Sequence, residues 1–183
     1  MADIFYTFLM AMIPIGELRL AIPVGIVVYG LNEFLVYFVS VVGNIVPVVF
    51  LLLFLGPVSK WLSEKSSLCR RFFSWIFGKT RAKHSEKIKK YGFWALALFT
   101  AIPLPITGGW TASLVAFLFD VPFKKALGAI SLGVAIAGII VLLMVKAGIA
   151  IQQFYGMQVL IGILLIVALF FVMFKIIKKA QHE

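Results

Sequence analysis

Apolar blocks alternate with short polar stretches along the chain, and together they predict a bundle of membrane helices. There are five such blocks, at residues 4–30, 34–55, 93–119, 126–145 and 157–174. A helix needs about 20 apolar residues to cross the roughly 30 Å hydrocarbon core of a bilayer. On that measure the second, fourth and fifth blocks predict plain transmembrane helices.

The first and third blocks differ, because proline and glycine interrupt both of them. The interrupting residues are Pro14, Gly16 and Pro23 in the first block, and Pro103, Pro105, Gly108 and Gly109 in the third. Proline removes a backbone donor and clashes with the preceding turn, whereas glycine favours non-helical geometry. Broken backbone at membrane depth has to be buried in protein or line a wet cavity. We therefore expect each block to form a re-entrant hairpin, which enters and leaves the membrane on one side.

The basic residues predict the orientation in the membrane. Of the 17 Lys and Arg residues, ten lie between Lys60 and Lys90, and the positive-inside rule places that segment in the cytoplasm. If all five blocks crossed the membrane, Lys124, Lys125 and the 175–179 tail would lie outside. If the third block returns to the cytoplasm instead, all these residues become cytoplasmic. We therefore expect a re-entrant third block and a cytoplasmic C-terminus in the inner membrane of the cell.

A weak internal repeat predicts how the first block is arranged. Ile13-Pro14-Ile15 resembles Ile102-Pro103-Leu104, and about 30 residues later Val42-Gly43 resembles Leu132-Gly133. Each half then consists of a broken block, a short polar turn and a full span, and the halves are inverted. Many secondary transporters have this architecture, with sites at the midplane where broken helices meet. The alternative is a chance match between two apolar blocks that contain proline and glycine.

These patterns predict an all-α integral membrane protein, built as an inverted repeat of re-entrant hairpin plus transmembrane helix with an extra C-terminal transmembrane helix. The chain is 63% hydrophobic and 13% charged, too apolar for a soluble domain of 183 residues, so residues 1–183 are expected to form one membrane domain. The single Cys69 excludes an internal disulfide, and His84 and His182 lack metal-ligand spacing. No nucleophile–base pair or nucleotide loop is visible, so we expect no enzymatic activity and no cofactor.

Glu17 and Arg19 are charged residues inside the otherwise apolar first block. Translocon scales put the cost of such a residue in a membrane helix at about 2.5 to 3.5 kcal/mol, so both are expected to face protein or a wet cavity. One interpretation is a structural ion pair that fastens the hairpin to its neighbour. The other is a substrate or proton site, in which Glu17 carries a proton and Arg19 holds an anion through its forked donors.

The third block offers backbone groups and hydroxyls instead of ionisable side chains. The candidate site residues there are Thr107, Gly108, Gly109, Trp110 and Thr111. A helix that begins near Gly108 would present free amides at its N-terminus, and such an N-terminus attracts anionic groups. The alternative is a plain packing kink.

Two further patterns concern partners. Residues 58–91 mix basic residues with Trp61 and other apolar side chains, which is typical of an amphipathic segment at the lipid interface that binds anionic lipids. This interleaving argues against nucleic acid as a partner. Ala129, Gly133 and Ala137 recur at a spacing of four, which predicts close helix packing and is compatible with a homodimer.

The two interrupted motifs resemble those of the small multidrug export family. The residues that carry the resemblance are 14–23 (PIGELRLAIP) and 102–111 (IPLPITGGWT), and the likeness covers most of residues 10–145. That family is similar to the DedA-like membrane proteins, and the resemblance implies two re-entrant hairpins that face each other. It also implies a transporter of an amphipathic substrate, either a lipid phosphate carrier or a hydrophobic drug or cation, coupled to protons.

This chain departs from the DedA-like pattern in one respect. DedA-like proteins typically place arginine in or beside the second hairpin, and residues 99–111 contain none. A phosphate clamp made by second-hairpin arginines therefore does not transfer to this chain. The alternative function is a non-transporting assembly or scaffold factor that binds anionic lipid or a protein partner through residues 58–91.

Overall fold

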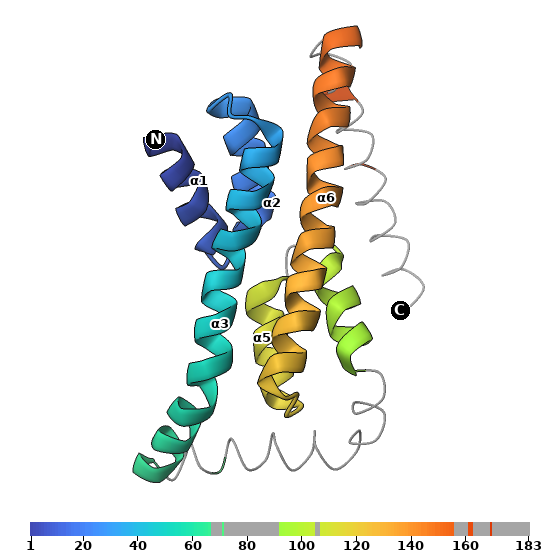
Figure 1. Ribbon diagram of the computed structural model, residues 1–183. Coiled ribbons are helices and arrows are strands. Elements are labelled where there is room, and N and C mark those ends of the chain that lie inside the picture. Colours follow the sequence, from blue (N-terminus) through green and yellow to red (C-terminus); the bar gives the residue numbers. More distant parts are fainter. Residues whose placement is uncertain (67–70, 72–91, 105–106, 156–160, 163–168, 170–183) are drawn as a thin grey trace. The chain divides into compact units, whose positions relative to one another are not determined.

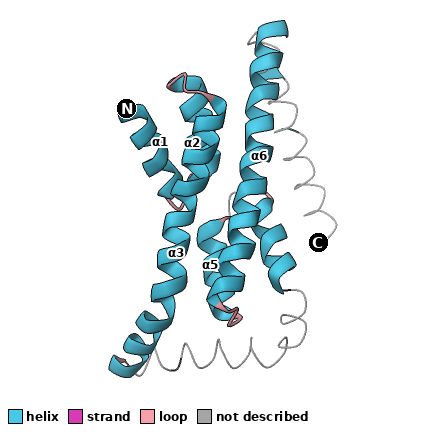
Figure 2. Cartoon of the chain, viewed as in Figure 1, coloured by secondary structure: helices cyan, strands magenta, loops and turns pink. Residues whose placement is uncertain are grey.

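The computed structural model describes residues 1–66, 71, 92–104, 107–155, 161–162 and 169 (Figure 1). The chain divides into two compact units, residues 1–142 and 143–183. Every regular element among the described residues is a helix (Figure 2), which confirms the predicted all-helical class. Most of the fifth apolar block, Pro105 and most of residues 58–91 fall outside the described residues.

The first apolar block forms three helical pieces with one break. Helix α1 covers Ala2–Met12, α2 covers Glu17–Pro23, and the π-helix η1 covers Val24–Val28. The break begins at Ile13, which is extended (φ −71°, ψ 132°) because the ring of Pro14 disfavours helical geometry in the residue before it.

The break expected at Pro23 does not occur. The backbone there continues from α2 directly into η1, so the helix changes type at this position instead of ending. Proline cannot donate the backbone hydrogen bond of an α-helix, and a local π-turn is one of the ways in which a helix absorbs such a defect. Of the two prolines in this block, Pro14 alone marks the break.

A tight turn joins η1 to the first long helix, α3, which covers Glu33–Lys65. Gly30 has φ +63°, a left-handed conformation that glycine adopts without steric cost, and Leu31 N donates to Gly25 O at 3.0 Å across the turn. The Asn32 side chain then caps α3, since its Oδ1 accepts from Phe34 N at 3.0 Å.

The second half of the first unit has the same order of elements as the first half: a short helix, a break, a second short helix and a long helix. The helix Gly92–Ala101 is followed by a break, then by α5 (Gly109–Leu118) and the long α6 (Phe123–Tyr155). The turn after α5 again contains a left-handed residue, Asp120, with φ 57°. Val121 N donates across this turn to Ala116 O at 2.9 Å.

Two of the described helices, α3 and α6, are long and apolar enough to cross a membrane. Each has 33 residues, which corresponds to about 50 Å of helix. Helix α3 extends ten residues beyond the predicted end at 55, with Pro47 and Pro57 inside it. Helix α6 likewise extends beyond the predicted span 126–145 at both ends.

Small residues form the interior of the first unit, and large apolar residues cover its surface. Ala129, Gly133 and Ala137 are buried, as their spacing predicted. By contrast, Phe38 and Phe50 on α3 are more than half exposed. This distribution is typical of membrane proteins, in which small side chains let helices approach closely while large ones face lipid.

Corresponding glycines make corresponding contacts in the two halves. A Cβ at Gly43 of α3 would lie 2.7 Å from Phe8 O of α1. A Cβ at Gly133 of α6 would lie 2.6 Å from Ala97 O of the helix Gly92–Ala101. In each half, the long helix thus packs directly on the backbone of the short helix that precedes the break.

Candidate functional site

Glu17 is the first residue of α2 and lies directly after the break in the first block. Its side chain is buried, with 4% exposure, and its backbone φ is +49°. A left-handed conformation in a residue with a side chain costs on the order of 1 kcal/mol, and strain of this kind clusters at functional sites. The surrounding contacts hold the strained residue in place, since Glu17 N donates to Ile13 O at 3.0 Å.

The Glu17 carboxylate accepts hydrogen bonds from two other helices. Trp110 N at the start of α5 donates to Oε1 at 3.4 Å, and Asn44 Nδ2 on α3 donates to Oε2 at 3.3 Å. The predicted helix N-terminus near Gly108 therefore exists, and the anionic group at it belongs to the chain itself. A carboxylate in this position is favoured by the helix dipole and by the unpaired amides of the first turn.

Gly108 and Gly109 permit this close approach because they lack side chains. A Cβ at Gly108 would overlap both carboxylate oxygens of Glu17 and lie 2.6 Å from its Cδ. A Cβ at Gly109 would lie 2.6 Å from Asn44 Oδ1 and 2.7 Å from Val48 Cγ2. The glycine pair therefore positions α5 against both α2 and α3, which is more specific than a plain packing kink.

Trp110 joins the two sides of the first break. Its backbone amide donates to Glu17, which begins α2, and its indole Nε1 donates to Met12 O at 3.1 Å. Met12 ends α1, and the last carbonyls of a helix have no partner within it. The second residue of α5, directly after the second break, thus donates hydrogen bonds to both helix ends that flank the first break.

Two threonine hydroxyls form hydrogen bonds with the backbone of the second break. The Thr111 hydroxyl accepts from Gly108 N at 3.0 Å, and so caps the amide that precedes α5. The Thr107 hydroxyl accepts from Leu104 N at 3.2 Å and donates to the carbonyl of Ile102. Both hydroxyls act on the backbone of their own loop, and neither contributes one of the two hydrogen bonds to the Glu17 carboxylate.

Arg19 is the third residue of α2 and is half buried. No ion pair joins it to Glu17, whose carboxylate is bonded to neutral donors on α3 and α5. Among the described residues, Arg19 Nε is buried without a hydrogen-bond partner. The two side chains therefore interact electrostatically without forming a salt bridge.

Asn44 is the site residue that the sequence did not identify. Asn44 lies in the apolar span of α3, where it is completely buried and donates to Glu17. Its Oδ1 has no hydrogen-bond partner among the described residues, and the same holds for the hydroxyl of Ser40, one turn earlier on α3. The sequence does show a single amide side chain in the middle of an apolar span, but no spacing along the chain connects Asn44 to Glu17.

The arrangement contains no metal centre within the described residues, where no group of three His, Cys, Asp or Glu side chains comes together. Its polar groups are the Glu17 carboxylate, the Asn44 side-chain amide and backbone groups at two helix ends. Such a set can exchange a proton or bind a polar group in an otherwise apolar surrounding.

Residues 17–140 match a protein family described as "Putative small multi-drug export protein". The match covers more than half of the 183 residues and includes Glu17, Asn44 and Trp110. The chain belongs to this family. No curated protein and no solved structure gave a match.

The family and the helices agree on the class of protein. The description is that of an export protein and names no enzymatic reaction. Helices α3 and α6 have the length and apolar character of membrane spans. The small multidrug export family identified from the sequence motifs is therefore confirmed, and this family member is a membrane protein.

Proposed function

We propose that this family member is a DedA-like transporter of an amphipathic substrate, with the buried Glu17 carboxylate as its central site. The observation that carries the proposal is the pair of hydrogen bonds to Glu17 from Trp110 N and Asn44 Nδ2. A carboxylate held between two broken helices is costly in hydrocarbon, and intramembrane carboxylates of this kind commonly serve ion or substrate pathways. The export description of the family agrees with this role.

The helix arrangement supports two facing re-entrant hairpins. Helices α1 and α2–η1 run antiparallel on either side of the first break (Figure 1). Their contact is close, since a Cβ at Gly25 would lie 3.3 Å from Thr7 Cγ2. The helix Gly92–Ala101 and α5 flank the second break in the same order along the chain. The matching contacts of Gly43 and Gly133 support an inverted repeat of the two halves.

The depth of the site also fits a transporter. Asn44 lies near the middle of the apolar stretch of α3 from Phe34 to Val58. In transporters built from inverted repeats, the substrate and coupling ion bind near the bilayer midplane, where discontinuous helices meet. Glu17 is bonded to Asn44 and therefore lies at the same depth.

The neighbours of Glu17 can serve both protonation states, which supports proton coupling. When the carboxyl group is ionised, Trp110 N and Asn44 Nδ2 act as donors to it. When it is protonated, its hydroxyl needs an acceptor, and Asn44 Oδ1 is buried without a partner among the described residues. Rotation of one amide side chain would exchange a donor for an acceptor. Arg19, with its free Nε, is the proposed contact for an anionic substrate group.

Flux into proteoliposomes tests the proposal. With an imposed pH gradient and a fluorescent lipophilic cation or a fluorescent phospholipid as probe, we expect Glu17→Gln to lower the flux of one of them at least tenfold. Glu64→Gln removes an exposed carboxylate at the far end of α3 and should leave the flux unchanged. Wild-type flux in both Glu17→Gln and Arg19→Ala, with folding intact, would contradict the assigned roles.

A further inference from the structure

An apolar groove of about 410 Å³ leads away from the Glu17 site along α3. Met12 and Trp110 form one end of it, and residues of α3 from Pro47 to Val58 form its length. The groove therefore begins at the two residues that are joined by the indole hydrogen bond. Its lining contains neither Glu17 nor Arg19, and Trp110 is the residue that it shares with the polar site described above.

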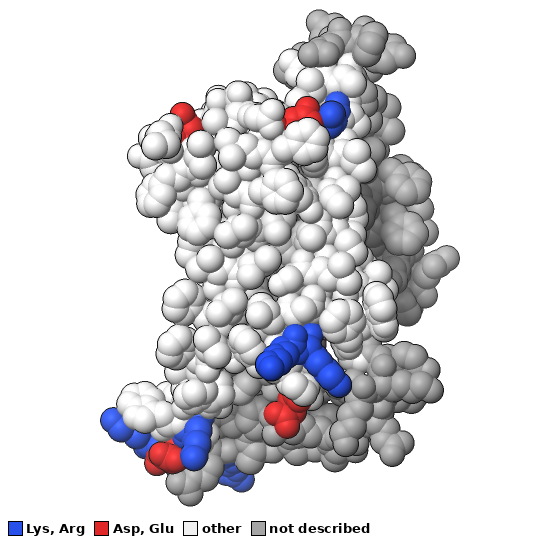
Figure 3. All heavy atoms as spheres, in the orientation of Figure 1, with Lys and Arg blue, Asp and Glu red and all other residues white. Residues whose placement is uncertain are grey.

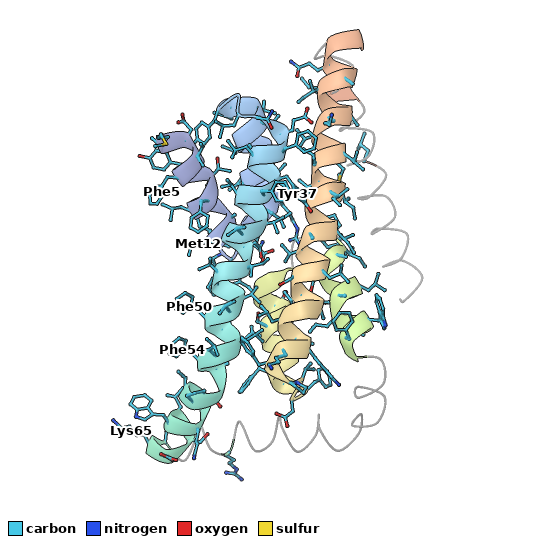
Figure 4. All side chains as sticks on the ribbon, in the orientation of Figure 1. Phe5, Met12, Tyr37, Phe50, Phe54 and Lys65 are labelled. Atoms are coloured by element: carbon cyan, nitrogen blue, oxygen red, sulfur yellow. The ribbon has the colours of Figure 1, made fainter. Side chains whose placement is uncertain are left out.

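The α3 residues that line the groove follow a helical spacing that continues to charged and aromatic residues. The lining positions on α3 are 47, 50, 51, 54, 55 and 58. Steps of three and four keep residues on one helix face, and the next positions on this face are Trp61 and Lys65. Met12, Phe50, Phe54 and Lys65 lie along the same side of α3 in Figure 4.

Trp61 and Lys65 form an anchor of the kind found at membrane–water interfaces. Lys65 Nζ lies 4.5 Å from the centre of the Trp61 ring, and both side chains are exposed. Tryptophan and lysine are enriched at the headgroup level of membrane proteins. The acidic neighbour Glu64 is rotated by about 100° around the helix from Lys65, so it lies off this face. Charged side chains gather at this end of α3, whereas the middle of the helix is uncharged (Figure 3).

The groove has the length of one lipid chain. Pro47 and Val58 are eleven positions apart, which corresponds to about 16 Å along a helix. One leaflet of a bilayer contributes about half of the roughly 30 Å hydrocarbon core, or about 15 Å. An acyl chain in the groove would therefore reach from the level of Val58 to Trp110, and Trp61 lies three positions, or about 5 Å, farther along α3 at the depth of the headgroup. The acyl chain would also cover Phe50 and Phe54, which are 56% and 54% exposed and whose rings stack at 6.1 Å.

We infer that this groove binds one anionic phospholipid, with an acyl chain between Met12 and Val58 and the phosphate headgroup at Lys65 and Trp61. The positive charge at the open end is complementary to an anionic headgroup, and the almost entirely apolar walls fit a hydrocarbon chain. The end of the acyl chain would contact Trp110 and Met12. The bound lipid would therefore stabilise the indole hydrogen bond between these two residues, which joins the two helix breaks. This inference depends only on the protein's being in a membrane, and not on transport.

Lipid retention by the purified full-length protein tests the inference. The detergent-solubilised protein is mixed with equal amounts of phosphatidylglycerol and phosphatidylcholine with identical acyl chains, and bound lipid is counted by native mass spectrometry. We expect about fivefold more phosphatidylglycerol to be retained, the effect of about one lysine near an anionic headgroup. Lys65→Gln should remove this preference, whereas Lys60→Gln, about 140° away around the helix, should keep it.

A second pair of variants tests the groove itself. Val58→Trp fills the groove and should lower the retention of both lipids several-fold. Val42→Trp changes another exposed valine of α3, outside the groove, and should not lower it. Equal retention of the two lipids by the wild type would overturn the inference. So would equal effects of the two lysine variants, or equal effects of the two valine variants. Loss of transport with normal lipid retention would affect only the proposed function.

Discussion

The backbone amide of Trp110 donates to Glu17 Oε1 at 3.4 Å, although 93 positions separate the two residues. Each of these residues lies at the start of a helix that follows a break. The first break presents a carboxylate and the unpaired carbonyl of Met12, while the second presents free amides and an indole N–H. The two breaks are therefore chemically complementary, and each satisfies polar groups that the other leaves exposed in an apolar environment.

Gly108→Ala should destabilise the protein through one steric conflict. Gly108 has an extended backbone (φ −170°), so alanine is allowed there, but its Cβ would overlap the Glu17 carboxylate. Overpacking of this kind costs about 1 to 3 kcal/mol. Thermal unfolding in detergent measures the effect, with Gly56→Ala as control, because no atom lies within 4 Å of a Cβ at Gly56. Equal melting temperatures for the two variants would contradict the contact.

Trp110→Phe should weaken the connection between the two breaks. Phenylalanine keeps an aromatic ring but lacks the indole N–H, so Met12 O loses its partner. The expected loss is about 1 kcal/mol, or about 3 °C in melting temperature for a chain of this length. Trp94→Phe is the matched control, because Trp94 is 67% exposed. The interpretation fails if both tryptophan variants melt together with the wild type.

Asn44→Asp should make stability depend on pH. The substitution replaces a donor to Glu17 by a second carboxyl group at about the same position. Two adjacent carboxylates cannot readily both be ionised, so the variant should be more stable at about pH 5, where they share a proton, than at about pH 8. Asn44→Ala removes the amide without adding charge and should be destabilised similarly at both values. A flat pH profile for Asn44→Asp would place Asn44 away from the carboxylate.

Cysteine labelling should reveal two hairpins that open on opposite sides. In a Cys69→Ser background, cysteines introduced at Asp3 and Leu31 flank the first broken block, and those at Gly92 and Pro122 flank the third. We expect the first pair to react with an impermeant reagent from outside and the second pair from the cytoplasm, because each block returns to its side of entry. If either pair labels from opposite sides, that block crosses the membrane.

The interruptions could be predicted from the sequence because proline and glycine act locally. Pro14 disfavours helical geometry at Ile13, and the helix N-terminus near Gly108 follows from the end of the proline-containing stretch. Three other prolines gave less information. Pro23, Pro47 and Pro57 lie within helical stretches, because neighbouring turns adjust around the missing donor, and this adjustment cannot be read from composition.

The sequence by itself determined that this protein is an all-helical membrane chain with two interrupted blocks, since apolar length and backbone restriction are local properties. The tertiary structure decided which groups meet. Glu17 is bonded to Asn44 and Trp110 and forms no ion pair with Arg19, because the left-handed backbone at Glu17 directs its carboxylate toward α3 and α5. Pairings between residues 27 and 93 positions apart depend on how helices pack, and the glycines that permit this packing act through space and not along the chain.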